Sequence, residues 1–259
     1  MRRVLVMLGL AAGWVLLESP AGSPAADTTR PQPTSQPTSQ GDELTEGGIH
    51  FNSQLGLEIW VADGWGEKQQ IGTTPAPQPV DIPKCRWWAI RRMPGESIDD
   101  VVAEARARKV PGLLLQGDVS TDDDLAHFRS WPNLTAIFVT GLGITDAGLV
   151  HLKEFKGLKA LDLFGTNITD AGLARLAELK GLQELALGRT KITDDGLAHL
   201  KHLPGLRAIF LGHTQITDAG LVHLKPLTGL RMLYVRDTKI TDAGLAELKK
   251  ALPDTTIVH

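Results

Sequence analysis

The chain has 259 residues, of which 42% are hydrophobic and 22% are charged, and this composition predicts a folded protein with a buried core. The formal net charge is −3, and no stretch of the sequence is rich in Lys and Arg. Such a chain lacks the positive charge that holds phosphate backbones or anionic lipid, so nucleic acid is not expected as a partner.

Residues 1–25 have the pattern of an export signal. Met1–Arg3 give a positive start, and Val4–Leu17 form an apolar run that is too short to span a bilayer comfortably. Small residues at Ser23–Ala25 or Ser19–Ala21 offer cleavage sites, although an uncleaved anchoring helix is an alternative. We expect a secreted, periplasmic or cell-surface protein with no stable membrane span after cleavage.

Residues 26–46 form a segment rich in Pro, Thr, Ser and Gln, with a tandem copy of Gln-Pro-Thr-Ser at residues 32–35 and 36–39. Such a segment has almost nothing to bury. It is predicted to be a disordered linker that holds the folded part away from the N-terminus.

Residues 47–94 carry a weaker pattern. Leu55, Leu57, Ile59 and Val61 alternate as in a strand, and a second apolar stretch contains Trp87, Trp88 and Ile90. We interpret this region as a small β-containing cap that covers one end of the C-terminal part of the chain. The single cysteine, Cys85, permits no internal disulfide; an unreactive, partly buried thiol is favoured over an intermolecular disulfide.

Residues 95–259 repeat themselves at a fixed interval. The motif Ile-Thr-Asp-x-Gly-Leu begins every 24 residues, at Ile144, Ile168, Ile192, Ile216 and Ile240. A degenerate copy at Thr121–Leu125 and an earlier apolar pattern bring the number of strand positions to about seven. Ser97-x-x-Asp100 resembles a capping box that opens the first helix.

Each unit combines two periods. Leu161 and Leu163 are two apart, as in a strand with one buried face, whereas Leu173, Leu176 and Leu179 are three apart, as in a helix with one apolar stripe. No single unit encloses a core, so neighbouring units must stack. Strands stack about 4.8 Å apart and helices about 8 to 10 Å apart, which bends the stack and places the sheet on its concave side.

Thr169 and Asp170 fall where a strand-to-helix turn gives way to the helix. A side-chain oxygen there can satisfy free helix amides, and an acidic residue favours the positive end of the helix dipole. We expect both residues to begin the helix of their own unit.

The pattern Leu-x-x-Leu-x-Leu-x-x-Thr-x-Ile-Thr-Asp-x-Gly-Leu resembles the leucine-rich-repeat family over residues 95–259, in particular its short 24-residue class, seen in secreted bacterial repeat proteins and related to the repeats of F-box substrate receptors. The resemblance implies an α/β leucine-rich-repeat solenoid, a curved right-handed β-α superhelix with a parallel concave sheet. Where the family often has Asn or Cys, this chain has threonines, whose hydroxyls we expect to bond loop backbone: Thr166, Thr190, Thr214 and Thr238.

The outward side chains of the predicted concave face are the candidate protein-binding site. The central column is Leu114, Phe138, Asp162, Ala186, Phe210, Tyr234 and Val258. It is flanked by Glu184 and Met232 on one side, by Gln116, Thr140, Phe164 and Arg236 on the other, and beyond them by Arg189, His213 and Asp237. Exposed aromatics, Met and Arg on a rigid sheet are typical of protein-binding patches. The candidates are Phe138, Asp162, Phe164, Glu184, Phe210, Met232, Tyr234, Arg236, Arg189 and His213; the alternative is that the aromatics cover one another or a terminal segment.

Metal and catalytic sites are not predicted. The repeated histidines His127, His151, His199 and His223 would lie about 8 to 10 Å apart on adjacent helices, too far to share one metal ion easily. Residues 122–124 are interpreted as a solvated helix start and not as a calcium loop. No catalytic motif occurs and one cysteine excludes a zinc ribbon, so we expect neither enzymatic activity nor a cofactor.

Three functions are compatible with the pattern. An exported, non-enzymatic protein-binding scaffold is favoured. A substrate-recognition adaptor of ubiquitin-ligase type would need a helical docking module, and residues 47–93 contain too many Gly, Pro and Trp for one. A regulator of a small GTPase would need a distinguishable arginine, which the sequence does not single out.

Overall fold

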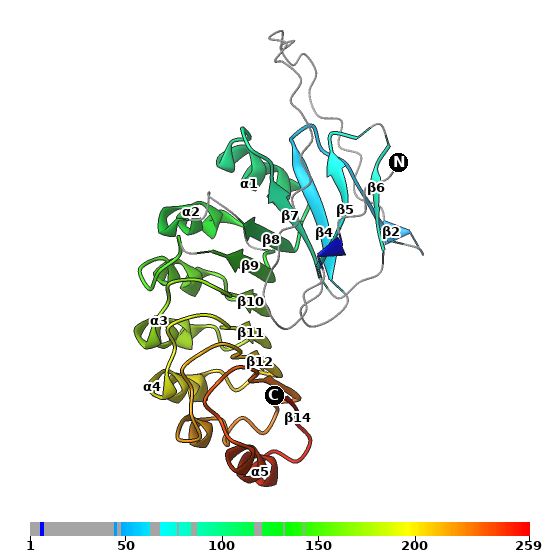
Figure 1. Cartoon of the computed structure of the whole chain (residues 1–259). Coiled ribbons are helices and arrows are strands. Elements are labelled where there is room, and N and C mark those ends of the chain that lie inside the picture. Colours follow the sequence, from blue (N-terminus) through cyan, green and yellow to red (C-terminus); the bar gives the residue numbers. More distant parts are fainter. Residues whose placement is uncertain are drawn as a thin grey trace, which may run out of the picture.

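The computed structural model describes residues 6–7, 44–45, 48–62, 68–76, 78–83, 87–116, 121–131, 133–141 and 143–259. The predicted signal and linker therefore lie outside the described residues, apart from Val6–Met7 and Leu44–Thr45. Cys85 also lies outside them. The described chain contains two parts that share one sheet, an N-terminal set of mostly antiparallel strands and a stack of repeated units (Figure 1).

The repeated units place one short strand each in a parallel sheet. These strands are β8 (Gly112–Gln116), β9 (Ala136–Thr140), β10 (Ala160–Asp162), β11 (Glu184–Ala186), β12 (Ala208–Phe210), β13 (Met232–Tyr234) and β14 (Thr256–Val258). Their register advances by 24 residues at every step, so that Phe138 pairs with Asp162, and Phe210 with Tyr234. The seven predicted strand positions and the predicted outward column are thus confirmed, and the fold is the expected leucine-rich-repeat solenoid.

The other side of the stack consists of short helices and helical turns (Figure 1). They are α1 (Ile98–Ala107), α2 (Asp122–His127), η1 (Phe128–Ser130), η2 (Gly148–Glu154), α3 (Asp170–Arg175), η3 (Leu176–Glu178), α4 (Asp194–Leu197), η4 (Ala198–His202), η5 (Gly220–His223) and α5 (Asp242–Ala251). The elements labelled η are 3₁₀ turns, in which side chains three apart eclipse one another. The i, i+3 leucine spacing therefore indicates helical turns tighter than the regular helix expected from the sequence.

An aspartate of each unit holds the threonine of the next. Asp170 Oδ1 accepts a hydrogen bond from the Thr193 backbone N–H at 2.8 Å, and its Oδ2 accepts one from the Thr193 hydroxyl at 2.6 Å. The same two bonds, of 2.6–2.8 Å, occur at Asp122–Thr145, Asp146–Thr169, Asp194–Thr217 and Asp218–Thr241. We call these five pairs the Asp–Thr ladder. Asp170 begins α3 as predicted, and it also joins neighbouring units, a role that the sequence analysis did not predict.

The ladder also explains why the repeated motif contains a threonine and a glycine. Thr169 Oγ1 donates to Asp146 and accepts from the Ala171 backbone N–H at 3.3 Å, so one hydroxyl serves the ladder and caps α3. Gly196 lies directly against Asp170 of the preceding unit, and a Cβ added there would overlap Oδ1 of that carboxylate. The glycine is therefore needed for close approach.

The ionised form of the carboxylate suits the ladder. At Asp218, the hydrogen bonds from the backbone and side chain of Thr241 lower the carboxyl pKa below its ordinary value. Hydrogen bonds to the charged form of a carboxyl favour that form, so the two bonds from Thr241 favour the ionised state of Asp218.

The buried threonine column satisfies backbone inside the turn, as predicted. Each hydroxyl donates to the carbonyl three residues earlier at 2.5–2.7 Å: Thr166 to Leu163, Thr190 to Leu187, Thr214 to Leu211 and Thr238 to Val235. Ser97, as predicted, caps α1 by accepting from the Asp100 backbone N–H at 3.4 Å.

The N-terminal strands extend the repeat sheet. They are β1 (Val6–Met7), β2 (Leu44–Thr45), β3 (Gly48–Phe51), β4 (Leu57–Ala62), β5 (Lys68–Thr74), β6 (Val80–Ile82) and β7 (Trp87–Arg92). The large sheet has the order β1-β5-β4-β7-β8 and then the repeat strands in sequence, with β7 parallel to β8, while β2, β3 and β6 form a separate sheet.

Both faces of β4 are covered. Leu57, Ile59 and Val61 enter the main core, which runs without interruption into the leucines of the repeats. Trp60 points the other way and packs in a second cluster with Leu114 and other small and aromatic residues of the concave face. The N-terminal sheet therefore contacts the solenoid at its end and on its inner wall. No helix within the described ranges has the length and apolar character needed to cross a membrane.

The ladder predicts a specific coupling between units. Gly196→Ala should destabilise the protein by about 1 to 3 kcal/mol, because the new methyl group overlaps Asp170. Asp170→Ala should cost about 2 kcal/mol through the loss of two hydrogen bonds to a charged group.

In the double variant the methyl group has room, because the Asp170 carboxylate is absent. Its loss in the free energy of unfolding, measured with urea, should therefore be smaller than the sum of the two single losses by at least about 0.5 kcal/mol. Additive losses would show that Gly196 and Asp170 act independently.

Candidate functional site

The concave face divides into a closed half and a second half with greater exposure. Phe138 on β9 is only 9% exposed and Glu184 on β11 only 8%. Phe164, Phe210, Met232 and Tyr234 are half-buried. The exposure expected for Phe138 and Glu184 is therefore wrong; the N-terminal strands cover Phe138. Phe210, Met232 and Tyr234 in the later units remain partly accessible.

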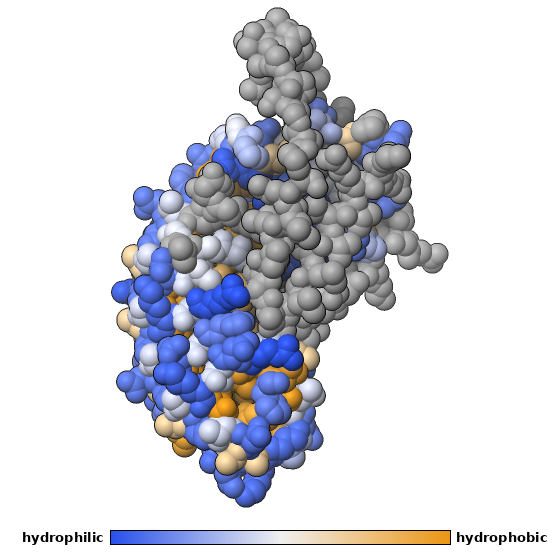
Figure 2. Space-filling model, in the orientation of Figure 1, coloured by the Kyte–Doolittle hydropathy of each residue, from blue (hydrophilic) through white to orange (hydrophobic). Residues whose placement is uncertain are grey.

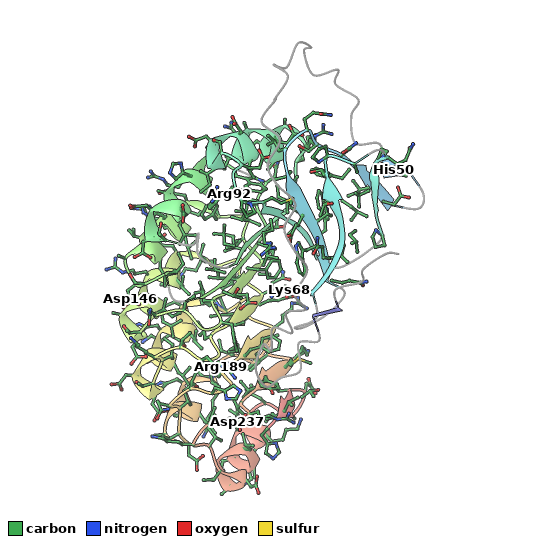
Figure 3. All side chains as sticks on the ribbon, turned by 45° about the horizontal axis from the view of Figure 1, so that its top comes forward. His50, Lys68, Arg92, Asp146, Arg189 and Asp237 are labelled. Atoms are coloured by element: carbon green, nitrogen blue, oxygen red, sulfur yellow. The ribbon has the colours of Figure 1, made fainter. Side chains whose placement is uncertain are left out.

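Lys68 at the start of β5 closes the first half. Its Nζ lies 2.6 Å from Asp162 Oδ2 on β10 and 4.7 Å from the centre of the Phe138 ring. The Lys68 and Asp162 side chains are 9% and 15% exposed, so the ion pair is largely removed from water. Asp162 Oδ1 also accepts from the Phe164 backbone N–H at 3.0 Å, which fixes the carboxylate. Figure 3 shows Lys68 at the part of the N-terminal sheet nearest the repeats.

A small hollow remains beneath this contact. It is lined by Trp60, Val61, Lys68, Trp88, Ala89, Leu114 and Phe138, and its volume is about 10 Å³. That volume is at the lower limit for one water molecule. This hollow therefore has no room for a small-molecule ligand.

Aromatic and charged side chains line the concave face beyond β10. The Phe210 and Tyr234 rings, on adjacent strands, lie 6.3 Å apart with a tilt of 31°. Burial raises the pKa of the Tyr234 phenol above its ordinary value, against the lowering effect of Arg236, so the neutral hydroxyl is present at pH 7. Figure 2 shows apolar residues gathered over the C-terminal units. Arg236, whose charge acts on Tyr234, is exposed.

Arg189 follows strand β11 in the turn toward α4. Its guanidinium carbon lies 5.6 Å from the centre of the Phe164 ring, a cation–π distance, and its side chain is exposed. Figure 3 shows Arg189 and Asp237 in the C-terminal units. The sequence placed Phe164 and Arg189 in neighbouring columns, and the structure brings their side chains into contact.

His213 and Asp237 occupy the equivalent position in the next two units. His213 Nε2 is buried and lies 3.5 Å from Asp237 Oδ2, yet it makes no hydrogen bond within the described part of the chain. The side chains are 26% and 53% exposed, respectively. His213 is thus held at the rim of the concave face.

The remaining sequence candidates stay apart. No group of three or more His, Cys, Asp and Glu side chains that could hold a metal ion occurs among the described residues. His127 lies 3.0 Å from Asp99, and Asp122 belongs to the Asp–Thr ladder. The interpretation of Asp122 as a solvated helix start did not predict its hydrogen bond with Thr145.

Three residues of the site were not selected from the sequence: Trp60, Lys68 and Trp88. Trp60 and Trp88 lie in stretches predicted to be β-structure, but Lys68 lies 94 residues from its partner Asp162 and belongs to no repeat. The local sequence around Lys68 contains no feature that identifies this contact.

Comparison with known proteins supports the family. A profile described as a leucine rich repeat matches residues 158–177, which is one unit. No curated protein matches the chain in sequence. The profile covers one unit, so in this unit the sequence is similar to the leucine-rich-repeat family, in agreement with the repeated architecture.

Two similar solved structures are internalins of Listeria monocytogenes. The internalin (inlF) is 22% identical with a TM-score of 0.41, covering 61% of this chain and 50% of its own. The internalin C2 (inlC2) is 21% identical with a TM-score of 0.47, covering 66% of this chain and 80% of its own. The chain thus spans half the length of the inlF structure.

The Lys68–Asp162 contact is testable by stability. Lys68→Met leaves the Asp162 carboxylate without its cation in a nearly dry site, so the free energy of unfolding should fall by about 2 to 4 kcal/mol. Adding Asp162→Asn should restore part of that loss, because the amide needs no counter-charge.

Urea unfolding of the wild type, both single variants and the double variant measures the coupling. A coupling energy near zero would show that Lys68 does not hold the N-terminal sheet on the concave face.

Proposed function

We propose that this chain is an exported, non-enzymatic scaffold that binds another protein on the concave face of strands β11–β14. The observation that carries this proposal is the aromatic pair Phe210 and Tyr234, with Met232 and Arg236 beside it on a parallel sheet. Aromatic, Met and Arg side chains are enriched in the energetically important centres of protein interfaces. The sheet holds them in fixed positions, which limits the entropy lost on binding.

The burial of the first half of the concave face narrows the location of the candidate binding site. Because Lys68 and Trp60 cover Phe138, the first units supply structural support and the partner would contact the later units. The candidate surface therefore shrinks from the predicted column to Phe164, Phe210, Met232, Tyr234 and the turn residues.

The adaptor alternative receives no support. Among the described residues before β8, α1 is the one helix, and it serves as the first helical element of the repeat stack. The GTPase-regulator alternative likewise has no specific observation in its favour. The non-enzymatic role rests on the sequence, in which no catalytic motif occurs.

Export is part of the proposal and rests on the pattern of residues 1–25. Fractionation of cells that express the full-length chain tests it. The processed or anchored chain should be found outside the cytoplasm; the full-length, unprocessed chain in the cytosol would contradict export.

The concave-face site is tested by Phe210→Ala combined with Tyr234→Ala. The full-length chain is used to capture partners, and the affinity of the identified partner is then measured for each variant. Two central aromatics at about 2 kcal/mol each predict a weakening of at least about 100-fold. The matched control is Val222→Ala, a 53% exposed site on η5 of the opposite side.

The double variant should keep the circular dichroism spectrum of the wild type. Unchanged affinity with an intact fold would remove the aromatic pair from the binding site.

A further inference from the structure

The turn after a repeat strand contains one residue in the left-handed backbone region. In four units this residue directly precedes the threonine of the buried column. It is glycine early in the stack and carries a side chain later, with φ values of 119° at Gly141, 70° at Gly165, 54° at Arg189, 59° at His213 and 57° at Asp237. Glycine adopts this conformation without strain, whereas other residues do so at a cost. The fold itself is therefore served best by glycine, and three successive units depart from that choice.

The fold does not need these three side chains. The link between neighbouring units is made by the Asp–Thr ladder, which includes none of these three residues. Arg189 contacts Phe164, and His213 meets Asp237 at 3.5 Å without a hydrogen bond at Nε2. Strained residues whose side chains have no structural duty cluster at binding sites. The row Arg189, His213 and Asp237, which we call the turn row, lies along the edge of the surface that contains Phe210 and Tyr234.

We propose that the turn row selects partners that carry an aspartate or glutamate next to an aromatic or aliphatic side chain, with Arg189 binding the carboxylate. This inference rests on the proposed function and specifies the chemistry of its partner. Arg189 is exposed and forms no ion pair with a carboxylate among the described residues. Phe164 restrains its guanidinium, so the two-pronged hydrogen bonding of an arginine with a carboxylate needs little further ordering.

The charge of the turns favours an acidic partner. Between the strand ends and the capping threonines, residues 187–192, 211–216 and 235–240 contain Arg189, Lys191, Arg236 and Lys239 against Asp237 alone. The Asp237 carboxylate lies 3.5 Å from His213 Nε2. The chain as a whole is acidic, so this local excess of positive charge distinguishes the turn row from the rest of the molecule. An apolar residue beside the carboxylate would meet the Phe210–Tyr234 pair.

Arg189→Gly tests the proposal without a confounding loss of fold. Glycine is the residue that Gly165 already supplies at this position, so the variant should unfold within about 4 °C of the wild type. The full-length wild type, Arg189→Gly and Arg189→Glu are each used to select from a display library of random dodecapeptides. The Phe210→Ala, Tyr234→Ala protein provides the background.

The wild type should enrich peptides with Asp or Glu adjacent to an apolar residue. Arg189→Gly should bind the same peptides at least about tenfold more weakly, and Arg189→Glu should shift selection toward Lys and Arg. Wild-type peptides without acidic enrichment, or acidic peptides that bind Arg189→Gly equally well, would overturn the inference and leave the proposed function standing.

Two other results are also decisive. If no peptide binds the wild type better than the background protein, the proposed function itself fails for linear segments. If Arg189→Gly unfolds at a much lower temperature, Arg189 serves the fold, and the premise of the inference is wrong.

Discussion

The two hydrogen bonds from each motif threonine to the aspartate of the preceding unit connect the repeats along their turn edge. A single unit has too few buried groups to fold alone, so every unit depends on its neighbours. The carboxylate accepts hydrogen bonds from both the backbone N–H and the hydroxyl of the threonine. The glycine of the following unit, which lies against the carboxylate, leaves the room that this contact needs. The Thr, Asp and Gly of the repeated motif thus form one contact between units.

Regular stacking fixes what the concave face can do. Strands at a constant register place outward side chains in straight columns, so a partner meets a surface whose chemistry changes by one residue per unit. In the early units, Lys68 and Trp60 of the chain itself cover the concave face. The later units keep aromatic and basic side chains accessible on that face. One scaffold therefore combines a capped end, which protects the core, with a surface suited to recognition.

The 24-residue period predicted the strands, their register and the outward column, because these properties depend on spacing alone. The role of the threonine hydroxyls was predicted from the family resemblance and from the need of a buried hydroxyl for a hydrogen-bond partner. The pairing of Asp170 with Thr193 was missed, since the same residues also suit a helix start within one unit. The burial of Phe138 was missed for another reason. Its cover comes from Lys68 and Trp60, which lie in a non-repeating region, and no local pattern specifies contacts across so many residues.

Hydrogen–deuterium exchange of the native chain tests the central claim that the Asp–Thr ladder joins the units into one cooperative body. The backbone amides of Thr145, Thr169, Thr193, Thr217 and Thr241 lie in turns, where amides without partners exchange rapidly. The ladder predicts that those of the central units exchange as slowly as the amides of the neighbouring strands. Rapid exchange of these threonine amides in an otherwise protected sheet would contradict it.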